Sequence, residues 1–218
     1  MSRSELKESA KASLKGKYGD IIIMFIAVAI ISAVASCAGA WLDNLFGLAK
    51  VEVIDLGFIK YTYRTTGILT ALFSFIVTGC LGFGIIEYFL NISRGKEVNW
   101  KDIFKRYDLF VPFVLLSIIA GLIICVGTIL LIIPGIIAAL ALSIVFYIKL
   151  DKPDLSYMDC IKKSNELMKG HKWEYFVLNL SFLGWILLVP FTLGLLAFWL
   201  APYITVTECN FYNKLAKK

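Results

Sequence analysis

The chain has 218 residues, of which 59% are hydrophobic and 17% are charged. Soluble domains average roughly 45–50% apolar and about 25% charged residues, so this composition excludes an ordinary soluble enzyme. The apolar residues form uninterrupted runs instead of periodic stripes, as a lipid environment requires. We therefore assign the formal net charge of +6 to contact with a membrane surface and expect no nucleic acid partner.

Four apolar runs follow a polar N-terminal segment. Runs 21–42 and 67–92 each have the length of one membrane-spanning helix. Runs 109–148 and 175–213 are about twice the roughly 20 residues that one crossing needs, so each predicts a helical hairpin. The sequence therefore predicts six spanning helices.

Proline and glycine mark the expected turns of the two hairpins. The first turn lies between Gly127 and Gly135, where Pro134 either closes the turn or opens the following helix. The second turn lies at Pro190 to Gly194.

Three parts of the chain share one signal for the start of a helix, a small polar residue followed three positions later by an acid. These pairs are Ser2 with Glu5, Asn99 with Asp102, and Ser156 with Asp159. Apolar residues at helical spacing follow each pair, so we expect an amphipathic helix on the membrane surface in each case.

A repeated motif suggests that these helices begin equivalent units. Leu14-Lys15-Gly16-Lys17-Tyr18 resembles Met168-Lys169-Gly170-His171-Lys172-Trp173 with one insertion. We predict three parallel repeats, each an interfacial helix followed by a hairpin, unlike the inverted repeats of many transporters.

The sequence thus predicts a single polytopic, all-α membrane domain with six transmembrane helices in three hairpins, each preceded by a cytoplasmic interfacial amphipathic helix. Its segments are the amphipathic helix 1–20, the first span 21–42, the outer loop 43–66, the second span 67–92, a cytoplasmic helix 93–108, the hairpin 109–148, a cytoplasmic helix 149–174, the hairpin 175–213 and the tail 214–218.

The distribution of cations predicts the orientation. Nineteen of the 22 Lys and Arg residues lie in the N-terminal segment, in the loops after the second and fourth spans, and in the tail. By the positive-inside rule both termini are cytoplasmic. Ala33 to Cys37 resembles a cleavage site, but the apolar run continues to Leu42, so we favour a retained first helix.

The outer loop contains two β-prone segments. Val51-Glu52-Val53-Ile54 and Phe58-Ile59-Lys60-Tyr61-Thr62-Tyr63 are separated by Asp55-Leu56-Gly57. A short β-hairpin and an irregular cap are the two alternatives.

Few residues indicate a chemistry, and we expect no catalytic residue, no metal site and no cofactor. Glu87 and Glu208 are the two acids within apolar runs, and an ionisable group at membrane depth is a candidate ion or headgroup site. Each lies about 10 Å along its helix from a charged boundary, so pairing with a cytoplasmic cation is the structural alternative. The candidate contacts for anionic lipid headgroups are Lys162, Lys163, Lys169 and Lys172.

Motifs in the second half resemble a known family. They are Ile132-Ile133-Pro134-Gly135-Ile136-Ile137, Met168-Lys169-Gly170-His171-Lys172-Trp173, Leu180-Ser181-Phe182-Leu183-Gly184-Trp185 and Ala201-Pro202-Tyr203. Arg3-Ser4-Glu5-Leu6-Lys7 and Leu14-Lys15-Gly16 near the N-terminus add to them. With these motifs most of the chain, and the outer loop least, resembles the bacterial membrane family called domain of unknown function 975. The resemblance implies a location in the bacterial plasma membrane and assigns no activity or catalytic residue.

The leading hypothesis is a non-enzymatic membrane protein that binds lipids or a membrane partner, a second copy of the chain included. The alternative is a small transporter or channel subunit that uses Glu87 and Glu208. An intramembrane enzyme is a third hypothesis, with less support because a catalytic site needs several convergent polar groups.

Overall fold

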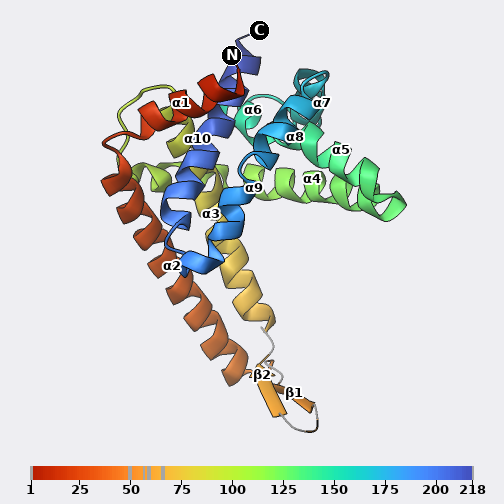
Figure 1. The fold of residues 1–218 in the computed structure, drawn as a ribbon. Helices are drawn as coiled ribbons and strands as arrows, with labels where there is room; N and C mark the ends of the chain where they lie inside the picture. Colours follow the sequence, from red (N-terminus) through yellow and green to blue (C-terminus); the bar gives the residue numbers. More distant parts are fainter. Residues whose placement is uncertain (1, 49–50, 56, 58–59, 65–66, 218) are drawn as a thin grey trace.

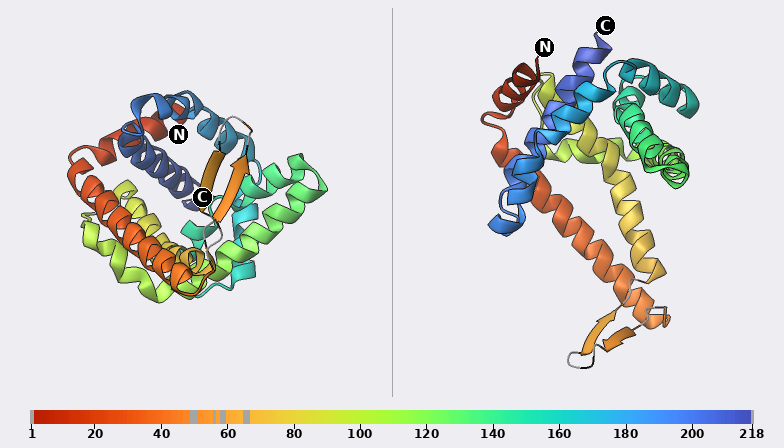
Figure 2. Two further views of the ribbon diagram at one scale, coloured as in Figure 1. Left: turned by 90° about the horizontal axis from the view of Figure 1, so that it is seen from below. Right: turned by 45° about the vertical axis from the view of Figure 1, so that its right-hand side comes forward.

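The computed structural model describes residues 2–48, 51–55, 57, 60–64 and 67–217. Both chain termini lie at one end of the molecule, here called the terminal end, and a β-hairpin lies at the opposite end (Figures 1 and 2). We describe the elements as three units: α1 to α3 with the β-hairpin, η1 to α6, and α7 to α10. In chain order the elements are α1 (Arg3–Leu14), α2 (Tyr18–Leu45), β1 (Val51–Asp55), β2 (Lys60–Arg64), α3 (Ile68–Ser93), η1 (Trp100–Leu109), α4 (Phe110–Leu130), α5 (Ile132–Leu142), α6 (Val145–Asp151), α7 (Tyr157–Met168), α8 (Lys172–Leu180), α9 (Leu183–Leu188), η2 (Pro190–Thr192) and α10 (Ala197–Ala216).

In the first unit, α2 and α3 pack together and extend away from the terminal end (Figure 1). Asp43, near the end of α2, caps the N-terminus of α3. Its carboxylate accepts hydrogen bonds from the backbone N–H groups of Leu69 (3.0 Å) and Thr70 (2.9 Å) and from the Thr70 hydroxyl (2.6 Å). Gly67 leaves room for this contact, because a Cβ there would lie 2.0 Å from Cγ of Asp43.

The two strands decide between the alternatives for the outer loop. β1 and β2 pair in antiparallel fashion, with Val51 opposite Arg64 and Asp55 opposite Lys60. The short hairpin is therefore confirmed. Leu56, Phe58 and Ile59, which belong to the predicted hairpin, lie outside the described residues.

In the second unit, α4 and α5 are joined at Leu131, which has an extended backbone (φ −165°, ψ 143°). This break lies inside the predicted turn, and Pro134 lies in the first turn of α5, so the second alternative for Pro134 is correct. The helices approach closely, because a Cβ on Gly135 would lie 2.2 Å from Oγ1 of Thr128. The α4–α5 pair extends to the side of the α2–α3 pair, so the two pairs diverge (Figures 1 and 2).

The segment before α4 is a 3₁₀-helix, η1, where the periodicity predicts an α-helix. Arg106 within it has non-helical dihedral angles (φ −108°, ψ 28°). The predicted start signal is present, because the Asn99 N–H donates to Oδ2 of Asp102 at 2.8 Å. The Ile103 carbonyl oxygen lies 2.0 Å from the position that a Cβ on Gly84 would take, so η1 and α3 are in backbone contact.

The first helix of the first unit, α1, recurs at the start of the third unit as α7. Both α1 and α7 have 12 residues, and the side chains of Ser2 and Ser156 cap them by accepting from the third helical residue. With the offset in residue number that relates Ser2 to Ser156, three buried residues of α1 correspond to three of α7: Leu6 to Cys160, Ala10 to Ser164 and Leu14 to Met168. The glycines after the helices, Gly16 (φ 80°) and Gly170 (φ 83°), share the left-handed conformation. The same offset also relates Tyr18, the first residue of α2, to Lys172, the first residue of α8. The two segments therefore align without a gap, and the insertion predicted between the two motifs is wrong.

Within the described residues, five helical segments are long and apolar enough to cross a membrane: 18–45, 68–93, 110–130, 132–151 and 172–192. α10 is not among them, and the six spans, the three hairpins and the cytoplasmic position of the amphipathic helices stay predictions. The turn before α10 is where the sequence predicts it, because Pro190 begins η2 and Gly194 has a positive φ of 84°.

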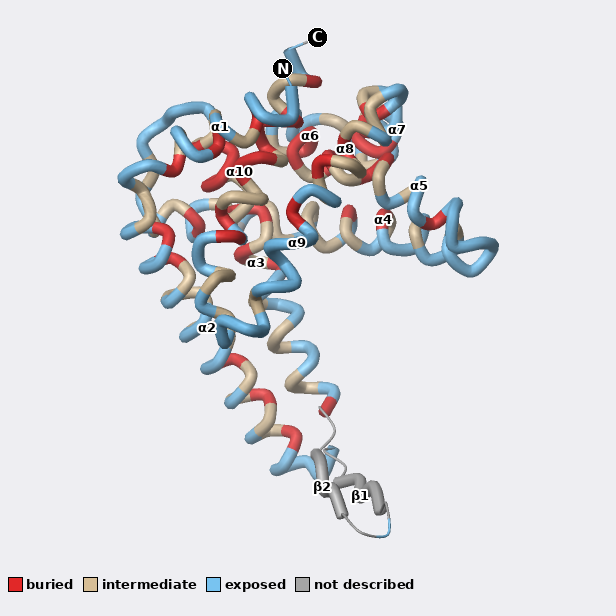
Figure 3. The backbone as a smooth tube through the Cα atoms, viewed as in Figure 1, coloured by how far each residue is buried: buried red, intermediate tan, exposed pale blue. Residues whose placement is uncertain are grey.

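Burial differs between the two ends of the molecule. Most buried residues lie at the terminal end, whereas exposed residues dominate the distal parts of α2 to α5 and the α9 turn (Figure 3). Many of these exposed residues are large and apolar; Ile129 is 79% and Leu193 is 94% exposed. A surface of this kind is unfavourable in water and favourable in hydrocarbon, so these apolar helices indicate a membrane-embedded protein.

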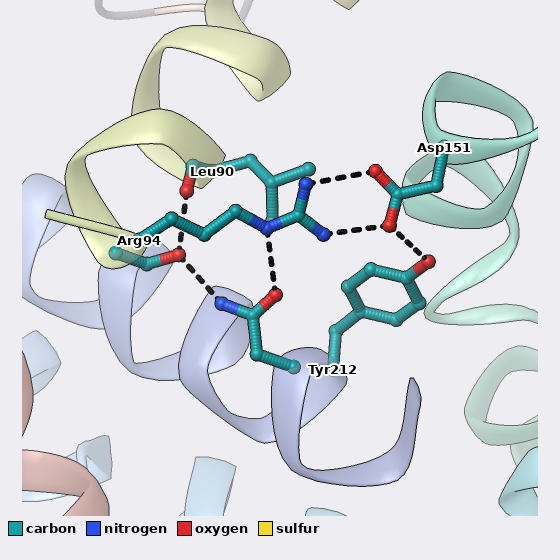
Figure 4. A network of polar contacts seen from close by, with 6 residues as sticks. Leu90, Arg94, Asp151 and Tyr212 are labelled. Atoms are coloured by element: carbon teal, nitrogen blue, oxygen red, sulfur yellow. Dashed lines mark hydrogen bonds and ion pairs between the residues drawn. The ribbon is translucent and has the colours of Figure 1, made fainter. Parts of the chain in front are cut away.

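The ends of α3, α6 and α10 meet in one polar junction (Figure 4). The Arg94 guanidinium, just after α3, donates to both carboxylate oxygens of Asp151 at the end of α6, at 2.8 and 2.6 Å. From α10, the Tyr212 hydroxyl donates to Asp151 at 2.8 Å, and Oδ1 of Asn213 accepts from Nε of Arg94 at 3.0 Å. The charge pair connects the first two units, and the hydrogen bonds of Tyr212 and Asn213 connect the third unit to it.

We predict that Asp43→Ala lowers Tm in detergent by roughly 2–6 °C, because two N–H groups of α3 lose their acceptor. Asp43→Asn retains an acceptor and lowers Tm less. Asp154→Ala, an exposed acid on a loop, is the control and leaves Tm unchanged. Equal Tm values for the Asp43 and Asp154 variants would contradict the cap.

A double-mutant cycle tests the junction. The Arg94 and Asp151 side chains are about 30% exposed, so we expect a coupling energy of about 1 kcal/mol in unfolding experiments on the Ala variants. The Lys105–Asp102 pair, with Lys105 74% exposed, serves as the matched control and couples by less than about 0.5 kcal/mol. Coupling energies of equal size would mean that the junction is no stronger than a surface pair.

Candidate functional site

The first helix of each unit packs on the last helices of another unit: η1 on α3, α7 on α5 and α6, and α1 on α10. The contact of α1 with α10 joins the first unit to the third. A groove accompanies each of these joints, and the residues that line the three grooves differ in charge.

The α5–α7 groove has a volume of about 440 Å³ and combines an apolar wall with cations. α4 and α5 contribute only apolar residues, whereas α7 contributes Ile161 and two polar residues, and the start of α8 contributes one lysine. Its lining residues are Ile123, Pro134, Ile137, Ala138, Ala141, Leu142, Ile161, Lys162, Asn165 and Lys172.

The polar side of the α5–α7 groove is held in place by α7. The buried Ser164 hydroxyl donates to the Ala141 carbonyl at 2.7 Å and fixes α7 against α5. Lys162 and Asn165 flank Ser164, and Nζ of Lys172 donates to Oδ1 of Asn165 at 3.2 Å. Because no carboxylate occurs among the described lining residues, this end of the groove carries a net positive charge.

Only two of the four lysines that the sequence predicts as lipid contacts line this groove. Lys162 and Lys172 line the α5–α7 groove, whereas Lys163 and Lys169 do not. Lys163 lies beside Lys152, and contact with that ammonium lowers the pKa of Lys163. Lys169 is the exposed residue that follows α7. Asn165 was missed, although its spacing of three residues from Lys162 places both on one helix face.

The η1–α3 groove contains Glu87 and has a volume of about 360 Å³. Oε2 of Glu87 lies 3.1 Å from Nε of Arg106, so this acid pairs with a cation from η1. Lys105 and Asp102, which also line the groove, form a second pair at 2.8 Å. The Tyr88 hydroxyl is buried and has no hydrogen-bond partner among the described residues.

Glu208 lies elsewhere, on α10. It accepts a hydrogen bond from the Tyr175 hydroxyl of α8 at 2.9 Å. The two acids that the sequence nominates therefore have separate partners on separate elements, and the structure does not bring them together in one site.

The α1–α10 groove also has a volume of about 360 Å³. Lys7 and Lys11 of α1 line it, and their ammonium groups lie 4.2 Å from the ring centre of Phe182 and 5.7 Å from that of Tyr203. Its other lining residues are Tyr18, Trp185, Leu196, Trp199, Leu200 and Tyr203.

Comparison with known proteins concerns the second half of the chain. Residues 118–218 match the family described as "Protein of unknown function (DUF975)". The resemblance to domain of unknown function 975 is therefore confirmed over this segment. No curated protein and no solved structure matches the chain. All the lining residues of the α5–α7 groove lie inside the DUF975 segment, whereas α1 lies outside it.

Proposed function

We propose that the protein is a non-enzymatic, multi-pass protein of a bacterial plasma membrane that binds an anionic phospholipid in the α5–α7 groove. The observation that carries the proposal is the continuity of an apolar wall with two lysines in one groove. An anionic phospholipid has the matching chemistry, because its phosphate attracts the ammonium groups and its acyl chains contact the wall.

The orientation belongs to the same proposal. Both termini lie at one end, which supports an even number of crossings, and five segments of the described chain have the length and hydropathy of a spanning helix. α10 supplies the sixth: its 20 residues span about 30 Å, and polar residues near its end lower its hydropathy. The positive-inside rule favours a cytoplasmic terminal end, so the groove opens toward the inner leaflet.

We expect Lys162→Gln with Lys172→Gln to weaken the binding of phosphatidylglycerol by roughly 30-fold, from about 1 kcal/mol for each cation near a lipid headgroup. Native mass spectrometry of the full-length protein in mild detergent, titrated with phosphatidylglycerol, measures the change. Phosphatidylcholine, which has no net charge, serves as the reference lipid.

The matched control is Lys163→Gln with Lys169→Gln, which removes the same charge from the same part of the chain but outside the groove. This control retains the affinity of the wild type. Equal losses in both double variants would mean that the lysines act only as a diffuse surface charge, and would overturn the groove as the site.

The alternative, a transporter or channel subunit that uses Glu87 and Glu208, has less support because each acid is held by a protein partner. We expect vesicles containing the wild-type protein to show no cation or proton flux above that of empty vesicles. Flux in the wild type that disappears in the Glu87→Gln, Glu208→Gln variant would favour the transporter instead.

A further inference from the structure

The repeat of α1 in α7 extends to the grooves beside these helices. With the offset that relates Ser2 to Ser156, Lys11 corresponds to Asn165 and Tyr18 to Lys172. Lys11 and Tyr18 line the α1–α10 groove, and their counterparts line the α5–α7 groove. The two grooves therefore occupy equivalent joints, each between the first helix of one unit and the last helices of another unit.

The α1–α10 groove has the same combination of charge and apolar surface. Lys7 and Lys11 are one helical turn apart on one face of α1, and no carboxylate occurs among the described residues that line the groove. Partial burial, together with the positive charges of Lys11 and Arg3, lowers the pKa of Lys7. A pair of cations held together in this way is stabilised by a bound anion.

The opposite wall of this groove suits a lipid at the depth of the headgroups. Trp185 of α9 and Trp199 of α10 are 55% and 58% exposed. Tryptophan is enriched at membrane–water interfaces, where its ring contacts acyl chains and its N–H remains near polar groups. Leu196 and Leu200 extend the apolar surface along α10.

The third joint differs in charge. In the η1–α3 groove, Arg106 is paired with Glu87 and Lys105 with Asp102. The cations there are already neutralised by acids of the protein, so this groove has little affinity for a further anion.

We infer that the α1–α10 groove is a second site for an anionic phospholipid, bound by Lys7 and Lys11, so that the protein holds two such lipids and not three. This inference rests on the proposed function of the α5–α7 groove. The two sites depend on different lysines, so each can be removed separately.

The experiment counts bound lipids. Full-length protein in mild detergent is titrated with phosphatidylglycerol, and native mass spectrometry gives the number bound at saturation. We expect two for the wild type, one for Lys7→Gln with Lys11→Gln, one for Lys162→Gln with Lys172→Gln, and none for the quadruple variant. Lys105→Gln, in the η1–α3 groove, is the matched control and retains two.

A second variant separates charge from folding, because Lys7 and Lys11 also contact aromatic rings of α8 to α10. Lys7→Arg with Lys11→Arg keeps both charges and retains two lipids, with a thermal unfolding curve like that of the wild type. Loss of a lipid in this variant without a change in Tm would overturn the role of the charges.

The outcomes also separate the two proposals. Two lipids retained in the Lys7→Gln, Lys11→Gln variant, or one bound lipid in the wild type that depends only on Lys162 and Lys172, would overturn the second site and leave the first intact. No bound phosphatidylglycerol in the wild type would overturn both.

Discussion

The ion pair between Arg94 and Asp151 is the contact that the arrangement of the three units depends on most directly. The last helices of the units, α3, α6 and α10, converge there. Asp151 ends α6, where the helix dipole is negative and a carboxylate is unfavourable. Arg94 offsets this cost with two hydrogen bonds, and the same contact raises the pKa of the guanidinium. Because Tyr212 and Asn213 complete the contact from α10, the junction fixes all three helix ends at once.

This junction determines where the grooves between the units lie. Once the last helices of the units meet at the terminal end, η1 packs on α3 and α7 packs on α5 and α6. α1 packs on α10, so the first unit also contacts the third. The same kind of joint occurs three times among the described helices, and the acidic and basic residues that line its groove decide the charge of each one. Acids at Glu87 and Asp102 neutralise the cations of one joint, whereas the described residues that line the other two include lysines and no acid.

Local signals in the sequence predicted much of the fold. Polar residues before acids marked the starts of α1, η1 and α7, and proline with glycine marked the turns before α5 and α10, because these effects act within a few residues. The 3₁₀ winding of η1 and the break between α5 and α6 were missed. The first accompanies close contact with Gly84 of α3, and the second lies in an apolar run where periodicity gives no signal.

The candidate site was predicted only in part, for a related reason. Charge counting identified Lys162, Lys163, Lys169 and Lys172 as equivalent, but the direction of each side chain depends on how α7 packs on α5. Asp43 was missed because it caps a helix whose Thr70 lies 27 residues further along the chain. Asn165 was missed because its partner, Lys172, belongs to the next helix, α8. The partner of Glu87, Arg106, is on another element, so pairing was one of two open alternatives.

The choice of lysine in both grooves bears on what they hold. An ammonium on a flexible four-carbon stem is a mobile point charge, whereas arginine presents a rigid fork that suits a fixed ligand geometry. The stem of Lys172 starts on α8 beside the apolar wall, and its ammonium reaches Asn165 at the polar end. A side chain of this kind lies along apolar surface while its charge stays at the interface. A lipid headgroup is itself mobile, so lysine above a wall of small residues such as Ala138 and Ala141 fits a fluid ligand better than a rigid one.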